Sequence, residues 1–198
     1  MTDSQPIVSI IIPHWNGIDV LSECIESLKK STLPSFEIIV SDNASSDGSQ
    51  AWIKENHPDI ILLENDQNYG YAGGCNYGAD IAKGEFLLFL NNDTIQNPNW
   101  LQPLVDRMKS DESIAALQPK ILNYYNRKIF DYAGGSGGHL DLFCFPFARG
   151  RVFLEQEKDS GQYDDAQKCF WASGTAMLVR KKTFFAAGKF DETFFAHM

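Results

Sequence analysis

Short runs of apolar residues alternate with helix-like segments along the first half of the chain. One such run, residues 86–90, leads directly into Asn91-Asn92-Asp93-Thr94. A bulky apolar run that ends in turn-forming residues is typical of a strand buried on both faces. Similar runs come before it, and we interpret them as strands at residues 7–12, 36–41 and 60–63.

Apolar residues three or four positions apart mark the segments between these runs. Leu21, Cys24, Ile25 and Leu28 have this spacing, which predicts an amphipathic helix. Further helices are expected at residues 49–56, 76–83 and 98–110. Strands that alternate with helices at short spacing indicate right-handed βαβ units. We therefore predict a Rossmann-like α/β fold with a mainly parallel sheet and helices on both faces.

The pattern is less regular in the second half. Residues 114–119 suggest a strand, whereas residues 121–168 contain a glycine cluster and scattered aromatics, which we interpret as hairpins and a loop. Residues 171–179 are expected to form a returning strand, and residues 181–187 a helix that ends at Gly188.

Polar residues follow each of the early strands, in the segments 13–17, 42–48, 68–76 and 91–93. Pro13 is expected to end the first strand, because it cannot donate to a central ladder. In open α/β sheets, ligands bind at the carboxyl ends of the strands. Asn91 and Asp93, two apart on an extended segment, project to one side and can share a ligand or a cation. Asp42 can bind a nucleobase or a ribose, or only form an Asx turn.

Composition and charge limit the classes of ligand. The 198 residues are 43% apolar, which fits one domain with a sizeable core. A net charge of -9 and the lack of a basic stripe exclude nucleic acid as a partner. Segment 68–76 lacks the lysine of a P-loop, and no G-x-G-x-x-G follows the first strand, so neither an NTPase nor a dinucleotide oxidoreductase is supported. The four cysteines have no zinc-site spacing, as expected of reduced thiols in a cytosolic protein.

Five motifs, in this order, resemble those of the family 2 glycosyltransferases, in particular bacterial rhamnosyltransferase-like members. They are residues 8–13 (VSIIIP), 41–48 (SDNASSDG), 68–76 (NYGYAGGCN), 90–94 (LNNDT) and 188–192 (GKFDE). The resemblance implies a glycosyltransferase A fold and inverting transfer of a sugar from a nucleotide diphosphate, with dTDP-rhamnose or a UDP-sugar as the expected donor. It implies a saccharide or lipid-linked acceptor, and a role in cell-surface polysaccharide synthesis.

The resemblance also implies a role for each matching residue. By position, the substrate-binding residues are Pro13, Trp15 and Asn16 at the nucleoside, Asp42 at the base, Asn91 and Asn92 at the ribose and diphosphate, Trp171 and Gly174 toward the acceptor, and the motif residues Asn43, Asn68, Gly70 and Asn76. Asp93 is the expected ligand of Mg²⁺ or Mn²⁺. We divide the single domain, 1–198, into a nucleotide-binding half, about 1–112, and an acceptor-side part, about 113–198.

Two departures from the family pattern change these expectations. Asn91 stands where many relatives have Asp, which removes a negative charge and leaves the metal requirement open. Relatives also carry a Glu-Asp pair with the general base after the F-D-E segment, so we expect the base beyond Met198, an acceptor-side part that is incomplete, and donor binding without efficient transfer. Asp191 and Glu192 are weaker candidates for the base. Apolar surface left uncovered near Phe194 and Phe195 favours self-association.

Two other functions are compatible with a nucleotide-binding α/β domain. A nucleotidyltransferase needs a glycine- and lysine-rich loop after the first strand, where this chain has residues 13–17 instead. A non-catalytic module that binds nucleotide sugars remains an alternative. Neither a signal peptide nor a membrane span is recognisable, so we expect a cytoplasmic protein, with peripheral contact to the inner face of the membrane if its acceptor is lipid-linked.

Overall fold

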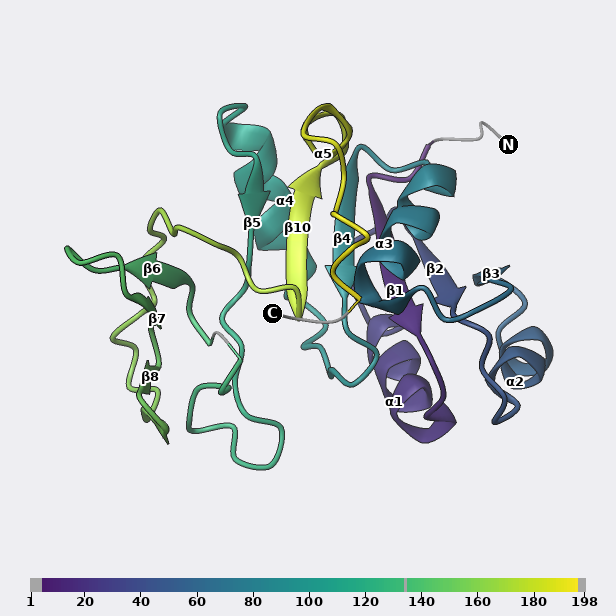
Figure 1. The fold of residues 1–198 in the computed structure, drawn as a ribbon, viewed down its shortest axis with the longest axis horizontal. Helices are drawn as coiled ribbons and strands as arrows, with labels where there is room; N and C mark the ends of the chain where they lie inside the picture. The colour runs from purple at the N-terminus through teal and green to yellow at the C-terminus, as the bar shows by residue number, and fades with distance from the viewer. Residues whose placement is uncertain (1–4, 134, 196–198) are drawn as a thin grey trace.

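The computed structural model describes residues 5–133 and 135–195. Its centre is a six-stranded sheet of order β3-β2-β1-β4-β10-β5 (Figure 1). The strands are β1 (Val8–His14), β2 (Phe36–Asp42), β3 (Ile61–Glu64), β4 (Phe86–Leu90), β5 (Ala116–Leu117) and β10 (Ala176–Arg180). β1 to β4 are parallel to their neighbours, and β10 is antiparallel to both β4 and β5. The mainly parallel sheet is confirmed.

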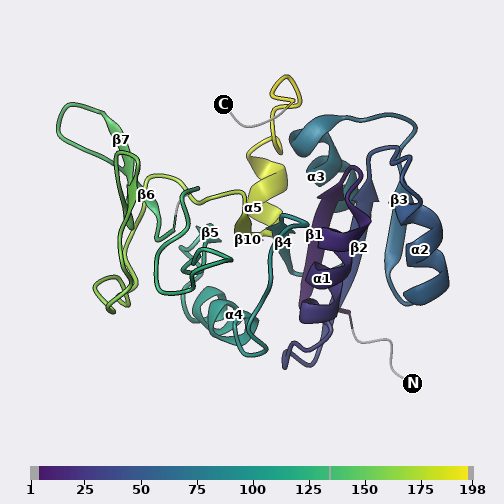
Figure 2. The same ribbon diagram turned by 90° about the horizontal axis from the view of Figure 1, so that it is seen from below.

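Helices cover both faces of this sheet, as Figure 2 shows. One face carries α1 (Ile18–Leu28), α2 (Ser49–Asn56) and α4 (Leu101–Ser110); the other carries α3 (Gly70–Ile81) and α5 (Lys181–Ala186). Side chains alternate along β1, so that Ile10 and Ile12 pack under the first set and Ile11 under the second. All five residues of β4 are fully buried, which explains their uninterrupted apolar run.

Pro13 lies inside β1, so the expectation that it ends the strand is wrong. β1 pairs with β4 only as far as Ile11, but with β2 as far as His14. The His14 carbonyl accepts from Asn43 N on the β2 side, which turns the nitrogen of Pro13 to the opposite side. Because β1 no longer pairs with β4 at this position, the N–H that Pro13 lacks would have had no partner in the sheet.

α3 begins at Gly70, earlier than the expected start at Asn76, so most of the predicted loop 68–76 is helix. The glycines serve packing instead. A Cβ on Gly78 would lie 2.5 Å from Ile11 Cγ2, because the helix lies so close to β1. Tertiary packing thus overrides the low helix propensity of glycine.

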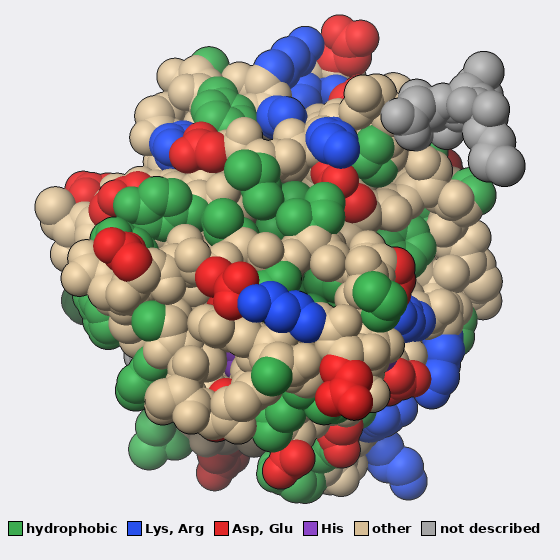
Figure 3. All heavy atoms as spheres, turned by 90° about the vertical axis from the view of Figure 1, so that its right-hand side faces the viewer, with side chains coloured by type: hydrophobic (Ala, Val, Ile, Leu, Met, Phe, Trp, Pro, Cys, Tyr) green, Lys and Arg blue, Asp and Glu red, His purple; other side chains and the backbone are tan. Residues whose placement is uncertain are grey.

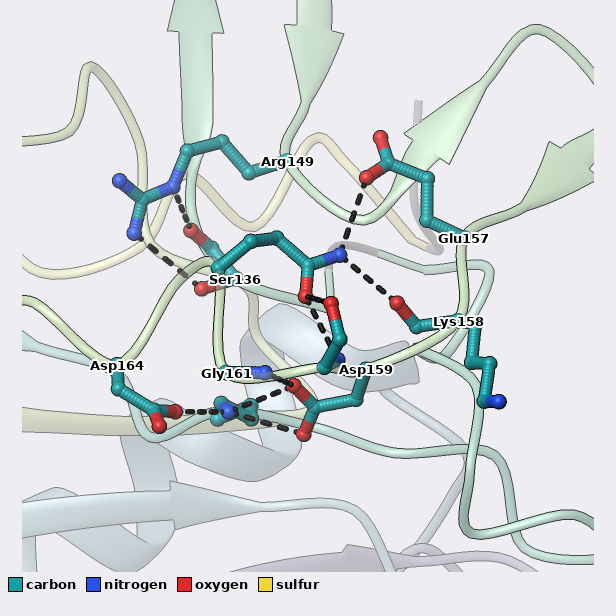
Figure 4. A network of polar contacts seen from close by, with 10 residues as sticks. Ser136, Arg149, Glu157, Lys158, Asp159, Gly161 and Asp164 are labelled. Atoms are coloured by element: carbon teal, nitrogen blue, oxygen red, sulfur yellow. Dashed lines mark hydrogen bonds and ion pairs between the residues drawn. The ribbon is translucent and has the colours of Figure 1, made fainter.

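Two small hairpins lie in the irregular region, as expected (Figure 1, green). They pair β6 (Gly138–Leu140) with β7 (Pro146–Ala148) and β8 (Arg151–Val152) with β9 (Glu155–Gln156). Residues 171–175, predicted as strand, form a loop before β10. Lys120 Nζ anchors the hairpin region by donating to both carboxylate oxygens of Asp159, at 2.9 and 3.0 Å. Asp159 belongs to the polar network that Figure 4 shows.

The molecular surface carries charges of both signs. Figure 3 shows the face that carries β3 and α2, where Lys and Arg side chains are interspersed with Asp and Glu. Such an arrangement gives no single-signed field of the kind that attracts a nucleic-acid backbone. Within the described ranges, no helix is both long enough and apolar enough to cross a bilayer.

Candidate functional site

A cavity of about 1000 Å³ opens at the carboxyl ends of β1, β2 and β4. Parallel strands bring their ends to the same edge of a sheet, which is where ligands bind in open α/β folds. β10 runs in the opposite direction, with Ala176 opposite Leu90, so the loop 171–175 that precedes it reaches this edge as well. Segment 190–195 contributes a further wall.

Most of the residues singled out from the sequence line this cavity. They are Pro13, Trp15, Asn43, Asn68, Gly70, Asn91, Asn92, Asp191, Trp171 and Gly174. Others lie behind its wall or beside it, namely Asn16, Asp42, Asn76, Asp93 and Glu192. The sequence motifs therefore converge in space, although their side chains have different surroundings.

Asp42 is fully buried at the end of β2. Its Oδ1 accepts hydrogen bonds from Ser45 N at 2.9 Å and Gln50 Nε2 at 2.6 Å. Its Oδ2 is buried and has no hydrogen-bond partner among the described residues. One oxygen thus forms the local turn, and the other is left for a donor that the described residues do not supply. A buried oxygen without a partner is costly, so a ligand N–H or O–H would be stabilised here.

His14, which sequence reasoning did not assign to the site, lines the cavity from the end of β1. Its Nδ1 lies 2.8 Å from Asn92 Nδ2, and its Nε2 lies 2.9 Å from Ser49 Oγ. Burial lowers the pKa of His14 more than Asp42 and Asp47 raise it, so the ring is neutral. Because an amide nitrogen only donates, Nδ1 accepts from Asn92, and Nε2–H donates to Ser49. The only signal in the sequence was the place of His14 directly after a buried strand.

Asn16 joins two loops at the mouth of the cavity. Its N–H donates to Ser45 Oγ and its Oδ1 accepts from Ser46 N, both at 2.8 Å. Asp47 strengthens the same junction, since its Oδ2 accepts from the N–H of Gly17 at 2.7 Å. Although burial opposes the shift, bonds from Ser49, Gly17 and the next residue lower the pKa of Asp47 to about 2. The junction holds the neighbouring Trp15, which is 58% exposed, at the cavity mouth.

Asn43, Asn68 and Gly70 shape the start of α3. Asn43 Nδ2 donates to the Gly70 carbonyl at 2.9 Å, and Asn68 Oδ1 accepts from Gly70 N at 2.8 Å. Gly70 has a φ of 69°, and a Cβ there would lie 2.0 Å from the carbonyl oxygen of Phe195. In this wall the amide group of Asn43 and both backbone polar groups of Gly70 are therefore already hydrogen-bonded.

Asn76 binds the carboxyl-terminal segment. Its Nδ2 donates to the Phe190 carbonyl and to Glu192 Oε1, both at 2.9 Å, and its Oδ1 accepts from Phe190 N at 3.1 Å. Asp191, between them, faces the cavity. Hydrogen bonds from Thr193 Oγ1 and N lower the pKa of Asp191, which makes its carboxylate a weaker base.

Asp93 is exposed just beyond β4 and makes no hydrogen bond or ion pair with any described residue. The described part of the chain holds no group of three or more His, Cys, Asp or Glu that suits a metal ion. Mg²⁺ is commonly bound by one or two carboxylates together with substrate phosphates. Asp93 therefore fits a cation that is held jointly with a diphosphate, and not a cation held by the protein alone.

Aromatic side chains line much of the cavity, namely Trp15, Tyr71, Tyr132, Trp171, Phe190, Phe194 and Phe195. Tyr71 OH donates to the Gly174 carbonyl at 2.6 Å, which holds the loop 171–175 against α3. Sequence reasoning did not identify Tyr132 and Arg151, which also line the cavity. They come from the hairpin region, where no periodic pattern marks them.

Known proteins are similar to this chain in sequence and in fold. A family model described as Glycosyl transferase family 2 matches residues 9–184. The O-antigen biosynthesis protein RfbC of Myxococcus xanthus is 31% identical over 96% of this chain, which spans 15% of that protein. Two solved structures, each 18% identical, share the fold: the mannosyltransferase PcManGT of Pyrobaculum calidifontis in complex with GDP-Man and Mn²⁺ (TM-score 0.65) and S. aureus TarS in complex with UDP (TM-score 0.68). They cover 96% and 95% of this chain, which in turn covers 49% and 51% of theirs.

Proposed function

The chain belongs to glycosyl transferase family 2, and from this premise we propose that it moves a sugar from a nucleotide-diphosphate donor to a hydroxyl of a saccharide or lipid-linked acceptor. Transfer inverts the anomeric centre, and dTDP-rhamnose or a UDP-sugar is the donor. The cavity at the strand ends supports the proposal, because a buried oxygen of Asp42 beside it lacks a partner among the described residues. The acceptor is part of a cell-surface polysaccharide.

The donor extends along the strand ends in this proposal. Asp42 Oδ2 accepts an N–H of the base, while Asn91 and Asn92 face the ribose and diphosphate. Asn92 presents its carbonyl oxygen to the donor, because its amide nitrogen donates to His14. Asp93 would hold Mg²⁺ or Mn²⁺ together with the phosphates, and such a cation would supply neutralising charge to the diphosphate leaving group. The complexes of PcManGT with GDP-Man and Mn²⁺ and of TarS with UDP support a nucleotide donor.

Transfer also requires a base for the acceptor proton. The acceptor oxygen attacks the anomeric carbon as the bond to the diphosphate breaks, and a carboxylate takes the proton. Asp191 is the only carboxylate among the described lining residues, and its lowered pKa weakens it in this role. We propose that a carboxylate outside the described residues is the base.

A thermal-shift panel of dTDP-, UDP- and GDP-sugars, with Mn²⁺ or with a chelator, tests donor binding. The matching nucleotide, at 100 times its dissociation constant, should add about 2.7 kcal/mol to the free energy of unfolding. If no nucleotide raises the midpoint, the proposal fails. Transfer of radiolabelled sugar by the full-length gene product, from the donor so identified to saccharide and lipid-linked acceptors, then separates a transferase from a non-catalytic binder.

A further inference from the structure

Arg151 of β8 is the only lysine or arginine among the described residues that line the cavity. Its Nη1 donates to the Tyr132 carbonyl at 3.0 Å, and its guanidinium lies 4.1 Å from the centroid of the Tyr132 ring. A guanidinium stacked on a ring and bonded at one nitrogen is fixed in orientation. Its remaining N–H groups make no other hydrogen bond to the described residues.

The charge of Arg151 has no acidic partner within the described ranges, although the chain carries 26 acidic residues against 17 basic ones. Arg149, two positions earlier, provides the contrast. It lies 3.6 Å from Asp165 and donates through Nε to the Ser136 carbonyl at 3.1 Å (Figure 4). A guanidinium that faces a cavity without a carboxylate partner is suited to bind an oxyanion from outside the protein.

The strand of Arg151, β8, lies beyond β10 and β5 from the strand ends of β1 and β2 that we assign to the donor (Figure 1). Between it and Asn91 the contacts pass through residues 132–133, then through Ser173 Oγ, which donates to the Ala133 carbonyl at 2.9 Å. They continue to Thr175, whose carbonyl accepts from Asn91 N at 3.0 Å. This separation places Arg151 on the acceptor side of the cavity.

We propose that Arg151 binds an oxyanion of the acceptor, a phosphate or a carboxylate, and thereby selects acidic acceptors. The proposal rests on the assignment of the donor to the strand ends. Arginine can present two parallel N–H groups to such an oxyanion, which gives both affinity and orientation. A neutral sugar gains nothing from this contact.

The test titrates three probes into the protein at saturating UDP: glycerol 1-phosphate, methyl glucuronide and neutral methyl glucoside. We expect Arg151→Gln to weaken the binding of the oxyanion probe by about tenfold, the loss typical of one charge-assisted contact. Arg151→Lys should give a smaller loss, because lysine keeps the charge but not the two-point geometry. Arg127→Gln is the matched control, because Arg127 is exposed, lies outside the cavity lining and carries the same charge.

Each result of these titrations either supports or overturns the proposed role of Arg151. A phosphate-only or a glucuronide-only loss supports the proposal and identifies the class of acceptor. Unchanged affinity for both oxyanions in folded Arg151→Gln overturns it, and so does a loss of UDP affinity, which would place Arg151 at the donor diphosphate. If UDP fails to bind the unmodified protein, the proposed function fails instead; the titrations without nucleotide still report on Arg151.

Discussion

Asp42 uses one carboxylate oxygen in the turn after β2 and keeps the other buried without a partner among the described residues. Asp42→Asn preserves size but can turn an N–H toward the ligand in place of an acceptor. We expect nucleotide binding to weaken by about 1.5–3 kcal/mol, the range for a hydrogen bond to a charged group. Calorimetric titration with UDP and dTDP measures the loss, with exposed Asp106→Asn as the control. Unchanged affinity in the folded variant would remove Asp42 from the donor site.

Asp93 is the carboxylate that we expect to share a cation with the diphosphate. Asp93→Ala should therefore abolish the Mn²⁺-dependent part of nucleotide-diphosphate binding and leave the binding of the nucleoside unchanged. Asn91→Asp adds a negative charge two positions away and should strengthen the Mn²⁺ dependence. Titrations of UDP and uridine, with Mn²⁺ and with chelator, separate these effects. Equal affinity of the unmodified protein for UDP under both conditions would exclude the metal role.

Asp191 faces the cavity, but its hydrogen bonds to Thr193 lower its pKa. We do not assign Asp191 as the general base, whose loss would reduce the rate of transfer by about 10²–10⁴-fold. We therefore expect Asp191→Asn to reduce that rate by less than about tenfold. Single-turnover transfer of labelled sugar is the measurement, and donor affinity is the control. A rate of transfer that falls by about 10²–10⁴-fold, with unchanged donor affinity, would identify Asp191 as the base.

At the scale of elements, α3 packs closely against β1 because Gly78 has no side chain. A methyl group on Gly78 would meet Ile11 Cγ2 at 2.5 Å. Although alanine favours a helix by about 1 kcal/mol over glycine, we expect Gly78→Ala to lower the free energy of unfolding by about 1–3 kcal/mol through overpacking. Urea denaturation measures this change. Combining it with Ile11→Ala should cost less than the sum of the two single changes, and strict additivity would count against the clash.

The elements that the sequence predicted well are those whose local and tertiary preferences agree. β4 is apolar because both of its faces are buried, and Gly188, at a φ of 93°, follows α5 as expected. The start of α3 was missed because its glycines fit tertiary contacts that no local pattern reports. A Cβ would lie 2.0 Å from the Phe195 carbonyl oxygen at Gly70 and 3.0 Å from Pro13 Cβ at Gly74. The same holds for the site. The motif residues converge as predicted, whereas Tyr132 and Arg151 reach the cavity from hairpins whose positions only the tertiary structure determines.

At the scale of the whole molecule, stability should fall in two steps as the pH is lowered. Burial lowers the pKa of His14 and His57 below 6.5, so the unfolded chain binds protons below about pH 6.5 that the folded chain does not. The free energy of unfolding therefore falls until the pH reaches the folded-state pKa values. The carboxylate of Asp47, with a pKa lowered from 3.8 to about 2, stabilises the fold above pH 3.8 and loses this effect as the pH falls toward 2.

Thermal midpoints between pH 8 and pH 2 test this profile. Replacing His14 and His57 by Gln should flatten the first step and leave the second one in place, because the backbone N–H groups of Gly17, Ile18 and Ser49 still donate to Asp47. A midpoint that stays constant from pH 7 to pH 5 in the unmodified protein would contradict the assignment of two buried neutral histidines.

The insertion of β10 between β4 and β5 has a consequence for biosynthesis. Residues 176–180 cover an edge of β4 at residues 86–90, so the ribosome must add more than eighty residues before that edge can be closed. Until then the nascent sheet presents a fully apolar strand with unpaired backbone groups, which is a template for association between chains. Pairing across such a long stretch of sequence also raises the contact order and slows folding. The strand that brings the loop 171–175 to the cavity thus leaves one edge of β4 open to association until residue 180 has been added.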